Sequence, residues 1–107
     1  MKNTKTFNKL VRDRIPEIIE SKGERCLTRV LTQEEYKKAL VEKLKEEVKE
    51  LQENICIEEV ADVLEVLDCL CHEYGFNKKE ILNFQKIKRQ KRGSFSKKLF
   101  LKKTFKN

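Results

Sequence analysis

Two pairs of carboxylates have the residue types and the spacing to bind a metal ion. The pairs are Glu47-x-x-Glu50 and Glu59-x-x-Asp62. Residues three apart lie on one face of a helix, so each pair presents two oxygen donors in one direction. An isolated ionised carboxylate is costly to bury unless a cation or a hydrogen-bond network replaces its water. Four converging carboxylates therefore predict a site for a hard cation, Mg²⁺ or alternatively Mn²⁺.

The apolar periodicity indicates which carboxylates face a core. At about 100° per residue, Glu47 falls inside the apolar arc of its helix and Glu50 falls just outside it. Glu46 points almost directly away from that arc and is expected to be a solvated charge. Glu59 lies among the apolar residues of the next helix, and Asp62 borders the same edge. Both pairs are therefore expected on the apolar sides of neighbouring helices.

Such pairs also arise without any function. Charged residues make up 40% of the sequence, and most E-x-x-E pairs are solvated faces or ion-pair ladders. Either pair alone favours that interpretation. Together, on core faces of adjacent helices, they favour a metal site, because ionisable groups in such places tend to be functional. Asp68 lies in the apolar arc of the second helix and is a weaker fifth candidate.

Local signals predict one short helix followed by three longer ones. Pro16 suits the first turn of the short helix, which Gly23 ends. Thr32 to Glu35 is a capping box that opens the first long helix. The four helices are expected over about residues 16–22, 33–54, 57–74 and 78–92.

Composition predicts an all-α protein whose helical bundle is completed by oligomerisation. The 107 residues include no Trp, one Pro and three Gly, which is typical of a single helical domain over residues 1–107. Short extended segments are expected near residues 26–31 and 95–101. The helix from Ile57 to Tyr74 is apolar over too much of its circumference for a small monomer. We therefore expect a homodimer or a homotetramer.

The cysteines and the single histidine are not expected to carry chemistry. The four cysteines lack C-x-x-C spacing, which argues against a zinc site or a disulfide framework. Nothing near His72 orients it as a base. No signal peptide and no long apolar run are recognised, so the expectation is a cytoplasmic protein with reduced thiols and no membrane span.

Positive charge is concentrated at the C-terminal end. The formal net charge is +7, but the first 85 residues hold fifteen basic and eighteen acidic residues, whereas the remainder holds ten basic residues and no acidic one. Lys88, Lys91 and Arg92 lie on one helical face, where contact with phosphate and plain solvation are equally compatible with the sequence. The basic tail, about residues 96–107, is expected to be solvated.

Several segments together resemble the all-α nucleoside triphosphate pyrophosphohydrolases. They are Asn8 to Pro16, Arg29 to Leu31, Glu46 to Leu51, Glu58 to Leu64, and Lys88 to Phe95. The nearest group is the short MazG-like proteins, often labelled phosphoribosyl-ATP pyrophosphohydrolase-like. The resemblance runs in order from residue 7 to about residue 101. The family more usually has Gly at the position of Ser94.

That resemblance implies a Mg²⁺-dependent hydrolase. Such an enzyme cleaves a nucleoside triphosphate between its α and β phosphates, giving a nucleoside monophosphate and pyrophosphate. By the resemblance, the metal ligands would be Glu47, Glu50, Glu59 and Asp62. A carboxylate not fully used as a ligand, Glu47 or Glu50, would accept the proton of the attacking water.

The resemblance also reaches basic residues at both ends of the chain. Lys88, Lys91 and Arg92 would stabilise charge on the phosphates of a nucleotide substrate. The N-terminal family pattern is matched by three weaker candidates, Lys9, Arg12 and Asp13. No spacing argument gives these three a role, and they are equally suited to fix the N-terminal segment through salt bridges.

A second interpretation is a non-catalytic helical module on the same scaffold. Its basic end would bind nucleic acid or a protein partner, and its carboxylates would hold only a structural metal ion. No basic patch with interleaved aromatic residues is obvious, so nucleic acid is not the expected partner. A third interpretation is an oligomeric interaction protein whose apolar helix binds a partner.

Overall fold

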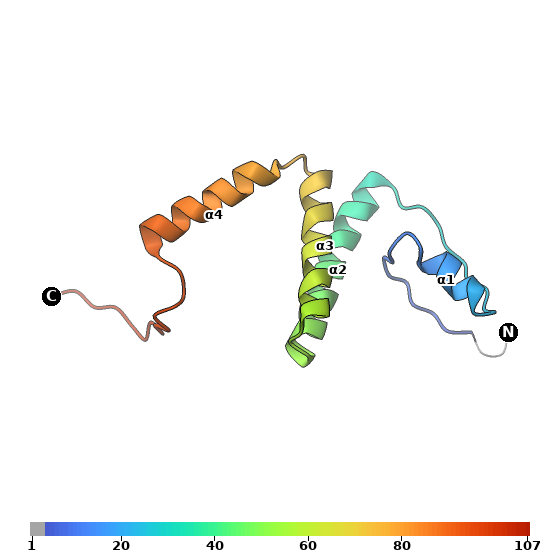
Figure 1. Ribbon diagram of the computed structural model, residues 1–107, viewed down its shortest axis with the longest axis horizontal. Coiled ribbons are helices and arrows are strands. Elements are labelled where there is room, and N and C mark those ends of the chain that lie inside the picture. Colours follow the sequence, from blue (N-terminus) through green and yellow to red (C-terminus); the bar gives the residue numbers. More distant parts are fainter. Residues whose placement is uncertain (1–3) are drawn as a thin grey trace. The chain divides into compact units, whose positions relative to one another are not determined.

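The computed structural model describes residues 4–107, and all of its regular secondary structure in that range is helical. The helices are α1 (Ile15–Ser21), α2 (Gln33–Glu53), α3 (Ile57–Glu73) and α4 (Lys78–Arg92) (Figure 1). No strand occurs among the described residues. The predicted all-α class is confirmed, and each helix lies close to its expected bounds.

Contacts within the chain divide it into two compact units. The first unit ends at Gly75 and contains α1, α2 and α3, whereas the second begins at Phe76 and contains α4. The single domain expected from the sequence stays a prediction.

The N-terminus of α2 is fixed by the predicted capping box. The backbone N–H of Glu35 donates to Thr32 Oγ1 at 3.2 Å, and the backbone N–H of Thr32 donates to Glu35 Oε1 at 3.0 Å. Arg29 adds two hydrogen bonds to the same carboxylate, at 3.0 and 2.7 Å. The hydrogen bonds from Arg29, followed by the one from Thr32, lower the pKa of Glu35 to about 2. The segment before α2 is thus tied to its first turn.

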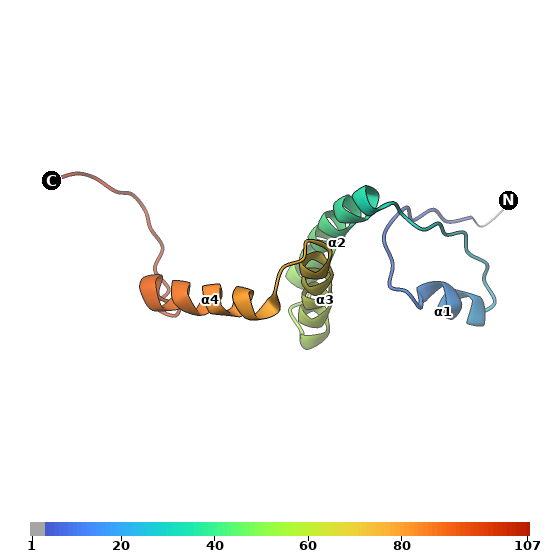
Figure 2. The ribbon, with the colours of Figure 1, turned by 90° about the horizontal axis from the view of Figure 1, so that it is seen from above.

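Helices α2 and α3 form an antiparallel hairpin and pack against each other (Figures 1 and 2). Their contact holds the buried apolar side chains of the described residues, Leu40 from α2 and Val66 from α3, which are 2% and 7% exposed. The hydrophobic core is therefore thin, since most other apolar side chains of the hairpin keep part of their surface in water. Because so few side chains are buried, the burial of the charged residue Glu47 among them is unusual.

The ends of α3 and α4 follow the predicted signals. Gly75, directly after the C-cap residue Tyr74, has φ +69°, a left-handed conformation that favours glycine. The Asn77 side chain accepts hydrogen bonds from the backbone N–H groups of Lys79 and Glu80 and caps α4. Gly93 ends α4. These boundaries are decided by local residue chemistry.

The two segments expected to be extended are irregular. Residues 26–31 connect α1 to α2 without forming a strand. At the start of the C-terminal segment, the N–H of Lys98 donates to the carbonyl of Phe95 at 3.1 Å, and Lys98 has φ +59°. This turn contradicts an extended conformation over residues 95–98. With no neighbouring strand to pair with, the backbone forms its hydrogen bond locally.

Helix α3 carries an apolar stripe that the first unit does not cover. The stripe consists of Ile57, Val60, Leu64 and Leu67, which are 88%, 43%, 54% and 39% exposed. Their spacing of three and four residues places them on one helical face. The stripe agrees with the expected oligomer, which stays a prediction. None of the described helices is both long and apolar enough to cross a membrane.

Candidate metal centre

Three of the four predicted carboxylates come together between α2 and α3. One carboxylate oxygen from each of Glu47, Glu50 and Glu59 lies within 4.8 Å of the other two. Glu47 and Glu50 are one turn apart on α2, and Glu59 lies in the first turn of α3. Packing α2 on α3 thus brings together carboxylates from two helices, three of the four that the spacing predicted. This group is called the carboxylate cluster below.

Glu47 is the buried member of the carboxylate cluster. It is 7% exposed and is the buried charged residue of the described chain. Its Oε2 atom and the Oε2 atom of Glu59 are buried and have no hydrogen-bond partner. A buried polar atom without a partner costs free energy, so it calls for a ligand that would satisfy it.

The pKa values of Glu47 and Glu59 are both raised. Burial raises the pKa of Glu47, and the neighbouring charge of Glu50 raises it further, outweighing the attraction of Lys43. Burial likewise raises the pKa of Glu59, with added repulsion from Asp62 and from Glu47. The carboxylate cluster thus gathers negative charge around a carboxylate, that of Glu47, which is largely removed from water.

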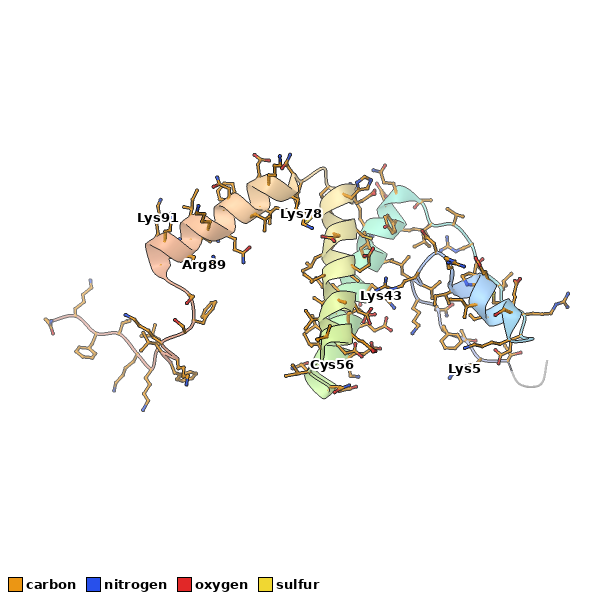
Figure 3. The ribbon with its side chains drawn as sticks, viewed as in Figure 1. Lys5, Lys43, Cys56, Lys78, Arg89 and Lys91 are labelled. Atoms are coloured by element: carbon orange, nitrogen blue, oxygen red, sulfur yellow. The ribbon has the colours of Figure 1, made fainter. Side chains whose placement is uncertain are left out.

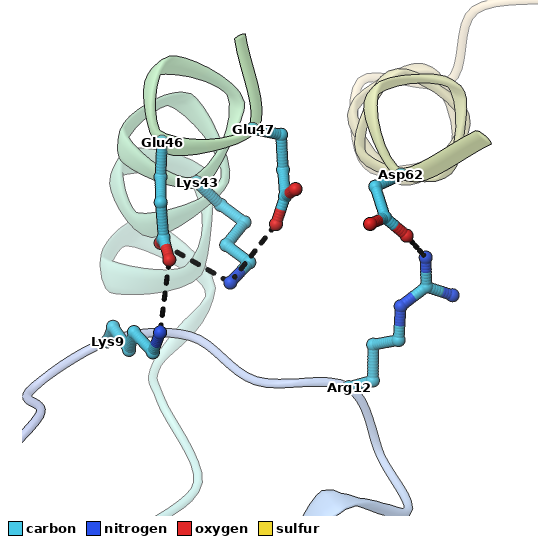
Figure 4. A network of polar contacts seen from close by, with 6 residues as sticks. All are labelled: Lys9, Arg12, Lys43, Glu46, Glu47 and Asp62. Atoms are coloured by element: carbon cyan, nitrogen blue, oxygen red, sulfur yellow. Dashed lines mark hydrogen bonds and ion pairs between the residues drawn. The ribbon is translucent and has the colours of Figure 1, made fainter. Parts of the chain in front are cut away.

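Asp62, the fourth predicted ligand, lies outside the three-oxygen group and is paired with an arginine. Arg12 Nη2 donates to Asp62 Oδ1 at 2.6 Å (Figure 4). Asp62 follows Glu59 by one turn of α3, and its charge contributes to the raised pKa values of Glu59 and Glu47. Asp62 therefore lies beside the carboxylate cluster and forms an ion pair with Arg12.

A chain of ion pairs runs from the N-terminal segment to Glu47. Lys9 Nζ lies 3.0 Å from Glu46 Oε1, Lys43 Nζ lies 3.3 Å from Glu46 Oε2, and Lys43 Nζ lies 3.4 Å from Glu47 Oε1 (Figure 4). The expectation that Glu46 is a solvated charge was wrong. Its side chain is 28% exposed, because the N-terminal segment lies against this side of α2.

Glu46 differs from its neighbour Glu47 in how it ionises. Partial burial acts to raise the pKa of Glu46, but the hydrogen bonds from Lys9 and Lys43 outweigh it and lower that pKa. Glu46 is thus a well-paired anion, whereas Glu47 is not. Of these two residues, Glu47 is the one that a further cation would neutralise.

Sequence reasoning missed Lys43, whose side chain is only 16% exposed. It precedes Glu47 by four residues, a spacing at which lysine and glutamate meet on a helix. That spacing is present in the sequence, but only acidic groups were expected at the site. Lys43 and Glu46 together connect the carboxylate cluster to the N-terminal segment (Figures 3 and 4).

The weaker N-terminal candidates have structural contacts. Lys9 binds α2 through Glu46, and Arg12 binds α3 through Asp62, so the alternative of fixing this segment by salt bridges describes what is seen. Asp13 and Asp68 are both exposed and do not join the carboxylate cluster.

The predicted phosphate-binding residues lie at the end of α4 in the second unit. Lys88, Lys91 and Arg92 are exposed. Arg89, Lys91 and Arg92 occupy the last turn of α4 (Figure 3), where positive charge favours the negative end of the helix dipole. That role is sufficient to account for their placement. Their contact with phosphate stays a prediction.

The donor set fits a hard divalent ion. Carboxylate oxygens are the ligands that Mg²⁺ and Mn²⁺ prefer, and two buried oxygens of the carboxylate cluster have no partner. Glu47, Glu50 and Glu59 are the residues that would hold such an ion. Comparison of the chain with models of protein families, with characterised proteins and with solved structures finds no match.

Proposed function

We propose that this protein is a Mg²⁺-dependent nucleotide pyrophosphohydrolase. It cleaves a nucleoside triphosphate between the α and β phosphates and releases a nucleoside monophosphate and pyrophosphate. Two observations support the proposal. One is the resemblance of the chain's segments to the MazG-like group, and the other is the carboxylate cluster between α2 and α3.

The single observation that carries the proposal is the state of Glu47. Its side chain is 9% exposed, and Oε2 lies buried with no hydrogen-bond partner. A structural carboxylate at such a depth is normally paired on both oxygens. A carboxylate with one unsatisfied oxygen beside Glu50 and Glu59 is instead suited to a cation that arrives with the substrate.

Metal binding and proton acceptance would fall to the acidic residues. Glu47, Glu50, Glu59 and Asp62 would hold Mg²⁺, with Mn²⁺ as the alternative ion. The ion would neutralise phosphate charge and lower the pKa of a bound water. Glu47 or Glu50 would accept the proton that this water loses, provided that one of its oxygens is not used as a ligand.

Basic residues would complete the site on the substrate side. A triphosphate carries several negative charges, which lysine and arginine bind by charge-assisted hydrogen bonds. Lys88, Lys91 and Arg92 of α4 are the residues proposed to supply such bonds. The homodimer or homotetramer proposed from the α3 stripe would then bury Ile57, Val60, Leu64 and Leu67.

Pyrophosphate release tests this function. Canonical, deoxy and modified nucleoside triphosphates would be incubated with the protein and Mg²⁺, Mn²⁺ or a chelator. Wild type should release pyrophosphate only with metal, and Glu50→Gln should lower the rate by about 100-fold or more. Glu42→Gln is the matched control, because Glu42 is exposed on the same helix and pairs with Lys45 at 3.1 Å.

Two outcomes would contradict the proposal. A folded wild-type protein that binds Mn²⁺ but cleaves no nucleotide would leave the carboxylate cluster as a structural metal site. Equal rates in Glu50→Gln and wild type would place the catalysis elsewhere.

One observation favours a second candidate, the basic module that binds nucleic acid. Phe95, Phe100 and Phe105 are 99%, 87% and 79% exposed, and lysine pairs at 97–98 and 102–103 separate them. The exposure of the three rings is the observation that favours this candidate. Exposed aromatic rings among lysines are suited to stack on bases of a single strand. Salt-dependent binding of a labelled oligonucleotide, lost in Phe100→Ala, would support this candidate.

A further inference from the structure

The contact between Arg12 and Asp62 is a single exposed ion pair. Only Nη2 of the guanidinium reaches the carboxylate, at 2.6 Å, and the two side chains are 56% and 38% exposed. By contrast, Arg29 donates two hydrogen bonds to the carboxylate of Glu35, at 3.0 and 2.7 Å. A pair with one contact and good access to water is readily replaced by a stronger partner.

Asp62 is the residue for which a bound divalent ion would compete with Arg12. It follows Glu59 by one turn of α3, and it is the only one of the four predicted ligands that lies outside the carboxylate cluster. A divalent ion held by Glu47, Glu50 and Glu59 would attract Asp62 more strongly than a single guanidinium does. Arg12 and such an ion therefore act on the same carboxylate.

We propose that Arg12 neutralises Asp62 in the metal-free protein, that a divalent cation displaces it, and that the freed guanidinium then binds substrate phosphate. This inference rests on the proposed function and adds a substrate-binding residue to it. The planar guanidinium matches the geometry of phosphate oxygens, which it binds with two parallel hydrogen bonds.

The anchoring of the N-terminal segment keeps Arg12 close after release. Lys9, three residues earlier, is bound to Glu46 at 3.0 Å, and Glu46 is also held by Lys43 at 3.3 Å. These pairs do not involve the proposed ligands Asp62, Glu50 or Glu59. The segment therefore stays attached to α2 while the Arg12 side chain changes partner.

Metal affinity is the first test. Mn²⁺ alone would be titrated into wild type, Arg12→Gln and Arg14→Gln, with the free ion followed by its paramagnetic resonance signal. Arg12→Gln should bind Mn²⁺ about threefold to fivefold tighter than wild type, because the competitor for Asp62 is gone. Arg14→Gln, which removes an arginine that pairs with Glu17 at 2.9 Å, controls for the change in net charge.

Phosphate affinity is the second test and should change in the opposite direction. Inorganic tripolyphosphate carries the substrate's phosphates without a base, so it suits a protein whose base preference is open. At saturating Mg²⁺, its calorimetric affinity should fall about tenfold in Arg12→Gln. Arg12→Lys keeps the positive charge but loses the planar guanidinium. Its affinity for tripolyphosphate should therefore lie between those of wild type and Arg12→Gln.

The outcomes separate this inference from the proposed function. If Arg12→Gln binds Mn²⁺ more weakly than wild type, Arg12 merely positions Asp62 and the inference is overturned. If Arg12→Gln and Arg14→Gln have equal affinities for Mn²⁺ and for tripolyphosphate, the inference is also overturned. That result would not contradict the proposed metal site. If wild type binds no Mn²⁺, the metal site and the inference fail together. Thermal melting monitored by circular dichroism confirms that each variant is folded.

Discussion

Lys43 and Glu47 lie one turn apart on α2, and the lysine satisfies only one side of the glutamate. Lys43 Nζ is 3.4 Å from Glu47 Oε1, whereas Glu47 Oε2 is buried with no hydrogen-bond partner. One oxygen thus orients the carboxylate within the helix hairpin. The other is left for a cation, which explains how a buried glutamate can be both fixed in place and available as a ligand.

Replacing Lys43 should therefore destabilise the fold. In Lys43→Met both Glu46 and Glu47 lose a cation, and the free energy of unfolding at pH 7 should fall by about 1–2 kcal/mol. Urea denaturation with a chelator present measures this. Lys45→Met, two residues away and paired with the exposed Glu42, should change the same free energy by less than about 0.5 kcal/mol. A smaller loss for Lys43→Met in a Glu47→Gln background would confirm the coupling.

The metal-free protein should become more stable on mild acidification. Glu47 and Glu59 have pKa values raised above their ordinary value of 4.5 in the folded state, chiefly by burial. The folded state therefore holds more protons than the unfolded state, and stability falls as the pH rises through the raised values. With a chelator, the melting temperature should rise as the pH drops from 7 towards 4.5.

Below that window the trend should reverse. Glu35 has a pKa of about 2 in the folded protein, lowered from 4.5 by Arg29, so protonating it removes stability that is present above 4.5. Glu47→Gln should flatten the rise between pH 7 and 4.5 without changing the fall below it. A melting temperature that decreases steadily from pH 7 downward in wild type would contradict the burial of uncompensated charge.

Truncating Leu40 should have a large effect because the core is thin. Leu40 is 2% exposed and packs between α2 and α3, so Leu40→Ala should lower the free energy of unfolding by about 2–5 kcal/mol. Thermal denaturation checks this. Val41→Ala serves as control, since Val41 is 42% exposed. Equal losses in the two variants would show that the core lies elsewhere.

A charge on the α3 stripe should disrupt the proposed oligomer. Leu64 is 54% exposed in the single chain, and burying Lys at this place in an interface would be costly. Sedimentation velocity should show an oligomer for wild type and a smaller species for Leu64→Lys. Glu65→Gln, a neighbouring polar change of the same charge difference, should sediment like wild type. A monomeric wild type would remove the oligomer from the proposal.

The sequence alone determined the helices and most of the carboxylate cluster. Thr32, Asn77, Gly75 and Gly93 mark helix ends through contacts with nearby backbone, so their meaning does not depend on the rest of the fold. Helical periodicity also placed Glu47 on the core face, where it is 7% exposed. Helix caps and helical periodicity both depend on residues three or four positions apart, so they can be predicted from the sequence.

Only the tertiary structure decided what pairs with those carboxylates. Arg12 and Asp62 are 50 residues apart in the sequence, and Lys9 and Glu46 are 37 apart, so no periodicity relates them. Their contacts depend on the path of the N-terminal segment across α2 and α3, which is why Glu46 was mistaken for a solvated charge. Local hydrogen bonding fixes a helix from its own residues, but the partner of a charged side chain depends on which distant segment packs beside it.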